Sequence, residues 1–289
     1  MPLVEHGVVL EAGPKERELT GSTTLQRFTF RPWRHRELLR ALIEREVIGR
    51  YRGSIAGLLW SFLNPLLMLL VYTFVFSVVF KVRWGTENDS NTQFALLVFT
   101  GMMVFNLFSE CLTRAPGLIL SHVNYVKKVM FPLDMLPCVM LGAVLFHTLV
   151  SFAVWLLFHL LAFGLPPPTA LLFPLVLLPL VLFTLGLSWV LASLGVYLRD
   201  VGQVIGVLMS ALLLMSAVFY PLSALPEAYR PWLYLNPLTL VIESSRDVLI
   251  WGVVPDLGLW LIELSVALGV AFLGWAWFEK TRPGFADVL

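Results

Sequence analysis

Residues 135–198 read MLPCVMLGAVLFHTLVSFAVWLLFHLLAFGLPPPTALLFPLVLLPLVLFTLGLSWVLASLGVYL and contain no Asp, Glu, Lys or Arg. A helix needs about 20 mostly apolar residues to cross the hydrocarbon core of a bilayer, so this stretch is long enough for two crossings. Pro166, Pro167 and Pro168 interrupt it, and a helix does not continue through consecutive prolines. The stretch therefore predicts two membrane-spanning helices, over about 133–165 and 169–198.

The composition of the whole chain also indicates a membrane protein. Hydrophobic residues make up 58% and charged residues 13% of its 289 positions, and the mean hydropathy is +0.82. Soluble domains carry about 25% charged residues, so a soluble domain is excluded. The net charge of +1 gives no sign of a nucleic-acid partner, and none is expected. Cys111 and Cys138 lack the spacing of metal ligands and are expected to be packing residues, and no metal site is predicted.

The remaining apolar stretches predict further spans over about 56–80, 92–113, 201–219 and 257–278. The expected fold is all-α, with six transmembrane helices in a domain covering residues 56–280. Between the last two spans, residues 220–256 are rich in proline and aromatic residues, and their apolar stretches are too short to cross. External re-entrant helices are expected there.

A different kind of helix is expected before the first span, over residues 35–55. Apolar residues recur there at every fourth position: Leu39, Ile43, Val47 and Tyr51. Charged residues, among them Arg50, occupy the other faces, so the helix is amphipathic and suited to the lipid headgroup region. An ordinary soluble helix is the alternative. Residues 1–34 and 281–289 are expected to be tails.

The distribution of basic residues predicts the orientation in the membrane. More Lys and Arg residues flank the predicted spans on the side of the N-terminus than on the opposite side. By the positive-inside rule, both termini are expected in the cytoplasm. The loop that contains Lys127 and Lys128 is then cytoplasmic as well.

Four segments in order resemble the membrane subunit of ABC-2 type polysaccharide exporters, which move O-antigen, teichoic acid or capsule glycans. They are RYRGSIAGLLWSFLNPLLMLLVYTFVFS (Arg50 to Ser77), NLFSECLTRAPGLILSHVNYVKKVMFPLDMLP (Asn106 to Pro137), YLRDVGQV (Tyr197 to Val204) and YLNPLTLVIESSRDVLIWG (Tyr234 to Gly252). The resemblance implies a homodimer in the inner membrane that exports a lipid-linked polysaccharide. It also implies two copies of a separate cytoplasmic ATPase.

The chain has no G-x-x-x-x-G-K-[ST] phosphate loop. The resemblance therefore implies that ATP and Mg²⁺ bind to the partner ATPase and that this chain holds no cofactor. It is expected to be a transporter subunit rather than an enzyme.

The resemblance places a coupling helix, which docks in a groove of the ATPase, at residues 116–128. The hypothesis is that its apolar residues dock while two lysines contact acidic groups: Leu118, Ile119, Val123, Tyr125, Lys127 and Lys128. The alternative is that the lysines only hold the topology and contact lipid phosphates. Arg199 and Asp200 form a second, very tight cytoplasmic turn.

Charged residues near or within spans are functional candidates, because charge at bilayer depth is costly. Glu110 is expected to pair with Arg114 four residues on. Glu263 is expected to face a dimer channel or to reach outward to the membrane surface. Three residues of the external re-entrant region suggest either a gate held by ion pairs or a locally satisfied helix: Glu243, Arg246 and Asp247.

Aromatic side chains suit the walls of a glycan channel, because sugar rings present apolar C–H faces. The candidates for channel lining are Tyr72, Phe76, Phe105 and Phe108. His147 and His159 are interpreted as packing or interhelical hydrogen-bonding residues. Two rival functions stay open: an ABC-2 permease for a small molecule or drug, and an integral-membrane glycan-modifying enzyme that would use Glu110, His147 or Glu263.

Overall fold

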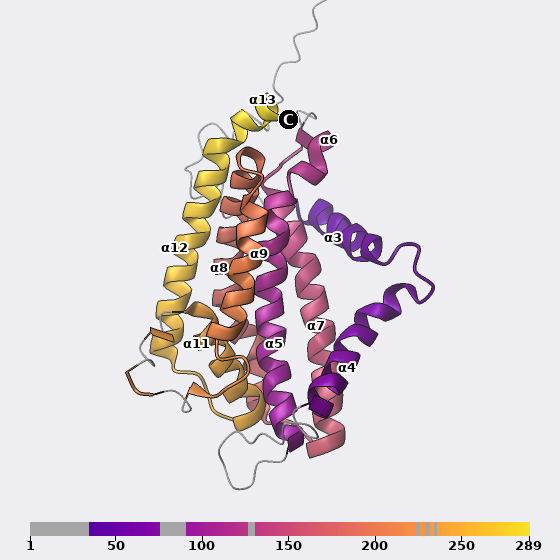
Figure 1. Ribbon diagram of the computed structural model, residues 1–289, viewed down its shortest axis with the longest axis vertical. Coiled ribbons are helices and arrows are strands. Elements are labelled where there is room, and N and C mark those ends of the chain that lie inside the picture. Colours follow the sequence, from indigo (N-terminus) through magenta and orange to yellow (C-terminus); the bar gives the residue numbers. More distant parts are fainter. Residues whose placement is uncertain (1–34, 76–90, 127–130, 223–225, 229–231, 234–235) are drawn as a thin grey trace, which may run out of the picture.

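The computed structural model describes residues 35–75, 91–126, 131–222, 226–228, 232–233 and 236–289, and all regular structure in these ranges is helical. Long helices run side by side as a bundle, and one end of the bundle carries the C-terminus (Figure 1). The all-α prediction is confirmed for these residues. The expected tail over 1–34 and the last residues of the first predicted span, 76–80, lie outside them.

Four helical segments are long and apolar enough to cross a membrane: Thr92–Gly117, Met135–Phe163, Pro168–Tyr197 and Leu257–Val288. Their main helices are α5 (Asn91–Arg114), α7 (Met135–Phe163), α8 (Phe173–Tyr197) and α12 (Leu257–Thr281). Two shorter apolar helices are α4 (Trp60–Thr73) and α9 (Val201–Met215). The other described α-helices are α3 (Arg36–Arg50), α6 (Val123–Val126), α11 (Pro237–Arg246) and α13 (Phe285–Val288).

The charge-free stretch forms two long helices, as predicted. α7 ends at Gly164, whose φ of +87° is a left-handed conformation that glycine adopts without strain. The prolines that follow then open a short 3₁₀ helix, η6 (Pro168–Leu172), which leads into α8. A turn of Arg199 and Asp200 reverses the chain from α8 into α9.

α8 and α12 approach each other closely through glycine. A Cβ atom at Gly274 of α12 would overlap the backbone oxygen of Gly186 on α8, and a Cβ at Gly186 would lie 2.6 Å from the oxygen of Val270. In a membrane the packing of small residues drives helix association, because lipid is as apolar as the side chains. These glycines therefore fix α12 against α8.

α3 and α4 occupy a different part of the fold. In Figure 1 they form an indigo arm that leaves the bundle beside α5 and α7. α3 packs on α7: Val47 is buried, and Ile43 lies where a side chain at Gly142 would be. Part of the predicted apolar stripe of α3 thus contacts protein.

The region between α9 and α12 is helical but short. Asn236 caps α11, accepting a hydrogen bond from the amide of Leu238 at 3.0 Å, and a π-helical turn, η8 (Asp247–Trp251), follows. Asp256 caps α12 in the same way, with its carboxylate 2.7 Å from the amide nitrogen of Gly258. α11 packs against α5 and α8.

The segment expected to hold a coupling helix, residues 116–128, consists of short helical turns in the part that the structure describes, up to Val126. The segment is divided into η4 (Ala115–Gly117), η5 (Leu120–His122) and α6. A Cβ at Gly195 of α8 would overlap the backbone of Pro116, so η4 lies directly on α8.

The glycine contact predicts opposite effects of one substitution at two positions of α12. Gly274→Ala should lower the free energy of unfolding by about 1–3 kcal/mol, because the new methyl group overlaps the backbone of α8. Gly269→Ala is the matched control, since a Cβ there meets nothing within 4 Å and alanine favours helix. Thermal unfolding in detergent measures both. Equal stability of the two variants would contradict the contact.

Candidate functional site

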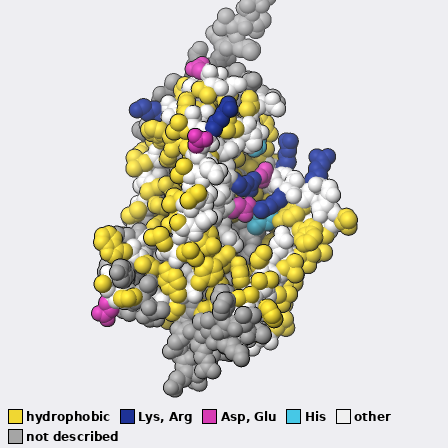
Figure 2. Space-filling view, viewed as in Figure 1, with side chains coloured by type: hydrophobic (Ala, Val, Ile, Leu, Met, Phe, Trp, Pro, Cys, Tyr) yellow, Lys and Arg dark blue, Asp and Glu magenta, His cyan; other side chains and the backbone are white. Residues whose placement is uncertain are grey.

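Charged side chains gather where α3 meets α5 and α7. Figure 2 shows them as a group beside a face that is otherwise largely hydrophobic. They surround a cleft of about 600 Å³ lined by Glu46, Gly49, Arg50, Glu110, Arg114, Ala143 and His147. We call this the charged cleft.

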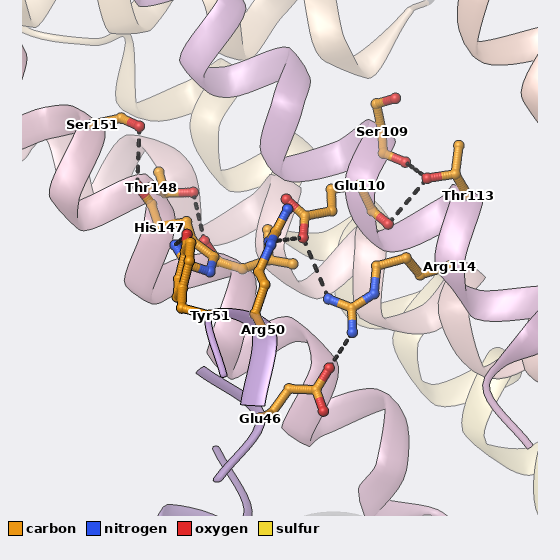
Figure 3. A network of polar contacts seen from close by, with 11 residues as sticks. Glu46, Arg50, Tyr51, Ser109, Glu110, Thr113, Arg114, His147, Thr148 and Ser151 are labelled. Atoms are coloured by element: carbon orange, nitrogen blue, oxygen red, sulfur yellow. Dashed lines mark hydrogen bonds and ion pairs between the residues drawn. The ribbon is translucent and has the colours of Figure 1, made fainter. Parts of the chain in front are cut away.

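Two arginines and two glutamates form one network in the charged cleft (Figure 3). Arg50 Nη1 lies 2.5 Å from Glu110 Oε1, and Arg114 Nη1 lies 3.3 Å from the same oxygen. The other terminal nitrogen of Arg114 pairs with Glu46. The predicted Glu110–Arg114 pair is confirmed, and it is one part of a network that ties α3 to α5.

His147 and Tyr51 extend the network toward α7. The Tyr51 hydroxyl lies 3.4 Å from His147 Nδ1, and the rings meet edge to face. The interpretation of His147 as an interhelical residue is confirmed. His159 contacts the Trp155 ring and lies with its Nδ1 3.0 Å from the oxygen of Gly164, so it is a packing residue as expected.

A second cleft, of about 400 Å³, continues from the first between α4, α5 and α7. Arg50, Glu110 and His147 line both clefts. The second cleft adds amide and hydroxyl groups, among them Asn64 of α4 and Asn106 of α5. Together the two form a polar path along the inner face of the α3–α4 arm.

The sequence reasoning missed this site because its members come from three helices. Glu46 and Arg114 are 68 positions apart, and Tyr51 and His147 are 96 apart. The one local signal was the i,i+4 spacing of Glu110 and Arg114. The predicted residues Arg50 and Tyr51 do belong to the site, although they were chosen as members of an interface helix.

Arg246, proposed as part of an external gate, is completely buried. Its guanidinium donates to the backbone oxygens of Leu97, Ala217 and Val218, at 3.3, 2.9 and 2.7 Å, and to Glu243 at 2.7 Å. Ala217 has a φ of +53°, uncommon for a residue other than glycine. This geometry favours the alternative to a gate, in which the polar groups of the helix are paired within the fold. Arg246 then joins α11 to α5 and to the end of α9.

The acidic neighbours of Arg246 are less buried. Burial raises the pKa of the Glu243 carboxyl, and the guanidinium of Arg246 opposes that shift. Burial likewise raises the pKa of Asp247, again opposed by Arg246. The arginine therefore favours the ionised form of both groups.

The predicted docking residues that the structure describes divide into two groups. Leu118 and Ile119 are buried in the hydrophobic core of this chain, so their side chains are not presented to a partner. Val123 and Tyr125 are partly exposed, and the Tyr125 ring stacks on Phe131 with centroids 4.3 Å apart. Lys127 and Lys128 lie outside the described residues.

The aromatic candidates are also spread over different surroundings. Phe105 and Phe108 are buried in the core, where Phe108 stacks on Phe183 of α8. Tyr72 is partly buried and lines the second cleft. Phe76 lies outside the described residues. Of the described three, Tyr72 lines the second cleft, and Phe105 and Phe108 line neither of the two clefts beside α3.

Glu263 lines a separate, mostly apolar pocket of about 280 Å³ between α8, α11 and α12.

The remaining candidate residues lie outside these clefts. Arg199 and Asp200 are exposed in their turn. Cys111 is buried and Cys138 partly buried, both as free cysteines. Among the described residues, no three His, Cys, Asp or Glu side chains group to hold a metal ion.

Comparison with known proteins identifies the class of this chain. Residues 37–250 match the model of the ABC-2 type transporter family. The chain belongs to this family. It is therefore a multi-pass membrane protein and a component of a transporter rather than an enzyme, in agreement with the resemblance that its sequence showed.

Individual relatives cover nearly the whole chain. It is 30% identical over 257 residues to the O-antigen export system permease protein RfbA of Myxococcus xanthus, spanning 88% of this chain and 96% of that protein. It is 25% identical over 255 residues to the protein of the same name from Klebsiella pneumoniae. It is also 25% identical over 250 residues to the polysialic acid transport protein KpsM of Escherichia coli, spanning 84% and 92%.

The ion network predicts that Glu110 holds α3 on the bundle. Glu110→Gln should speed hydrogen exchange of residues 36–50, because Arg50 and Arg114 lose the carboxylate that they share. Glu44→Gln, an equal change on the exposed side of α3, should leave the exchange unchanged. Exchange measured by mass spectrometry checks both, and unchanged exchange in Glu110→Gln would contradict the role.

Arg246 predicts a large effect on stability. Arg246→Met should lower the free energy of unfolding by about 3–5 kcal/mol, because it leaves Glu243 and three backbone oxygens without their buried donor. Arg36→Met, on the exposed surface of α3, is the control and should have little effect. Unfolding in detergent measures both, and similar midpoints would contradict the assignment.

Proposed function

We propose that this chain is the permease subunit of an ABC transporter that exports a lipid-linked, O-antigen-like polysaccharide across the inner membrane. The observation that carries the proposal is the similarity to the RfbA proteins along almost their whole length. The polysialic acid transport protein KpsM, which is also 25% identical to this chain, is likewise named for the transport of a polysaccharide. A permease for a small molecule or drug has no such support.

The transport unit is proposed to be a homodimer with two cytoplasmic ATPase subunits. The sequence has no phosphate loop, so ATP and Mg²⁺ would bind to those partners and this chain would hold no cofactor. Closure of the ATPase subunits would open a route for the glycan between the two copies. No nucleic acid takes part.

Six spans are proposed: the four long helices, together with the two shorter apolar helices α4 and α9. α9 has 15 residues and so extends about 22 Å, short of the hydrocarbon thickness of about 30 Å. α4 is followed by residues that are not described. An even number of spans would leave both termini on the cytoplasmic side, as the basic residues indicate. α3 would lie at the membrane surface and contact lipid headgroups.

The ATPase is proposed to bind the end of the bundle where η4 meets the turn before α9. η4 packs on both α8 and α9, so the beginning of the segment from Ala115 to Val126 lies near the turn of Arg199 and Asp200 that joins these two helices. The exposed parts of the segment and the turn offer Val123, Tyr125 and the turn itself. The two lysines that follow would contact acidic groups of the ATPase.

The function is tested by deleting the gene and restoring it in the organism of origin. The deletion strain should lose its surface polysaccharide and accumulate the lipid-linked precursor inside the cell. The intact gene should restore export, and it should do so only while the ATPase is present. Immunoblotting of the surface glycan measures the result, and normal surface glycan in the deletion strain would contradict the function.

The docking surface makes a separate prediction. Reversing both charges, Lys127→Glu with Lys128→Glu, should reduce recovery of the ATPase with the tagged permease, because like charges would then face each other. Arg36→Glu with Arg40→Glu, an equal change on the exposed side of α3, is the matched control. Undiminished recovery with normal membrane insertion would contradict docking through the lysines.

A further inference from the structure

The cleft between α4, α5 and α7 contains polar groups that the described residues leave without hydrogen bonds. Asn64 of α4 and Asn106 of α5 both line it, and neither side-chain amide has a hydrogen-bond partner among the described residues. Nε2 of His147, which lines the same cleft, is buried and also has no partner. We call this cleft the polar groove.

Asn106 and His147 lie on α5 and α7, two of the helices long and apolar enough to cross a membrane, and Asn64 lies on the shorter helix α4. Asn106 is eight residues before the end of α5 at Arg114, which places it about 12 Å along the helix from that end. A side-chain amide with no hydrogen-bond partner is costly in an apolar environment. Both amides are exposed in the single chain and so are available to a ligand in the cleft, and the buried, unpartnered Nε2 of His147 adds a third polar group to its lining.

The charges around the groove decide the chemical class of that ligand. Arg50 and Glu110 are paired where the polar groove meets the charged cleft, and Arg114 and Glu46 are paired just beyond. Two arginines balance two glutamates, so the site carries no net charge to attract an anion or a cation. Each pair still offers donors and acceptors at its free edges.

The uncharged side chains of the groove also offer both hydrogen-bond donors and hydrogen-bond acceptors. An asparagine amide both donates and accepts hydrogen bonds. The Thr148 hydroxyl donates to the oxygen of Val144 at 3.1 Å, which leaves its own oxygen free to accept. The Tyr72 ring adds an apolar aromatic surface to the lining. Donors, acceptors and an aromatic face together match the hydroxyl groups and C–H faces of a sugar.

We propose that the polar groove is a saccharide-binding site, in which Asn64 and Asn106 hold the hydroxyl groups of one or two sugar units of the exported glycan. The groove of about 400 Å³ and the charged cleft of about 600 Å³ fall in the range of ligand sites, about 300–1,000 Å³. The proposal rests on the proposed function, because the relatives supply polysaccharide as the substrate class.

Photo-crosslinking in living cells tests the site directly. A photoreactive benzoylphenylalanine is placed at position 64 or 106 of the tagged full-length chain, in a strain that makes the polysaccharide and in one that does not. Position 70, an exposed residue of α4 outside the groove, is the control. The expected result is a high-mass glycan adduct at 64 and 106, absent at 70 and absent without the polysaccharide.

Other results would overturn the site. An adduct of twice the chain's mass in both strains would show a second copy of this chain in the groove. Equal lipid adducts in both strains would show a lipid headgroup there, and equal glycan adducts at position 70 would show no selectivity. No adduct at 64 and 106 while export proceeds would also refute the site, whereas failure of the wild-type gene to restore export would refute the proposed function instead.

Substitution gives an independent readout that separates binding from structure. Asn64→Leu and Asn106→Leu should each reduce export about fivefold or more. Their thermal stability should stay equal or rise, because each removes an unpaired amide. Leu70→Ala should leave export unchanged. Loss of stability along with export would assign the amides to the fold, and unchanged export in both variants would refute the site.

Discussion

The hydrocarbon core of a membrane offers no water to pair with polar groups, and this constraint governs the whole structure. Helices satisfy their backbone groups internally, which is why the charge-free residues 135–198 form two long helices joined by a short proline-rich turn. The same constraint makes each charged or amide side chain costly. Each charged or amide side chain within the helix bundle is therefore expected to have a structural or functional role.

Two such places differ in how completely their polar groups are paired. Arg246 is fully buried, and its nitrogens reach three backbone oxygens and Glu243, which is the geometry of a fixed structural contact. The clefts beside α3 are open, and Asn64 and Asn106 have no partner among the described residues. Complete pairing holds helices together, and incomplete pairing leaves groups for a ligand.

Close backbone contacts would carry movement from one part to another. Gly195 brings α8 against Pro116 at one end, and Gly186 brings the same helix against α12 further along. An ATPase bound over residues 115–126 would therefore move η4 and α8 together. The ion network between α3 and α5 lies at the adjoining side of this end, since Arg114 is the last residue of α5 before η4. A movement of η4 would therefore shift Arg114 and change the geometry of the charged cleft.

The sequence by itself determined what depends on neighbouring residues: the all-α class, the long apolar helices, the turn at Pro166–Pro168 and the i,i+4 pair of Glu110 and Arg114. Only the tertiary structure decided that Glu46 joins this pair and that Leu118 and Ile119 turn into the core. It also decided that Arg246 reaches carbonyl groups far away in the sequence. Hydropathy records whether a segment is apolar, but contacts between helices depend on how each one is rotated and placed against the others, which no local pattern specifies.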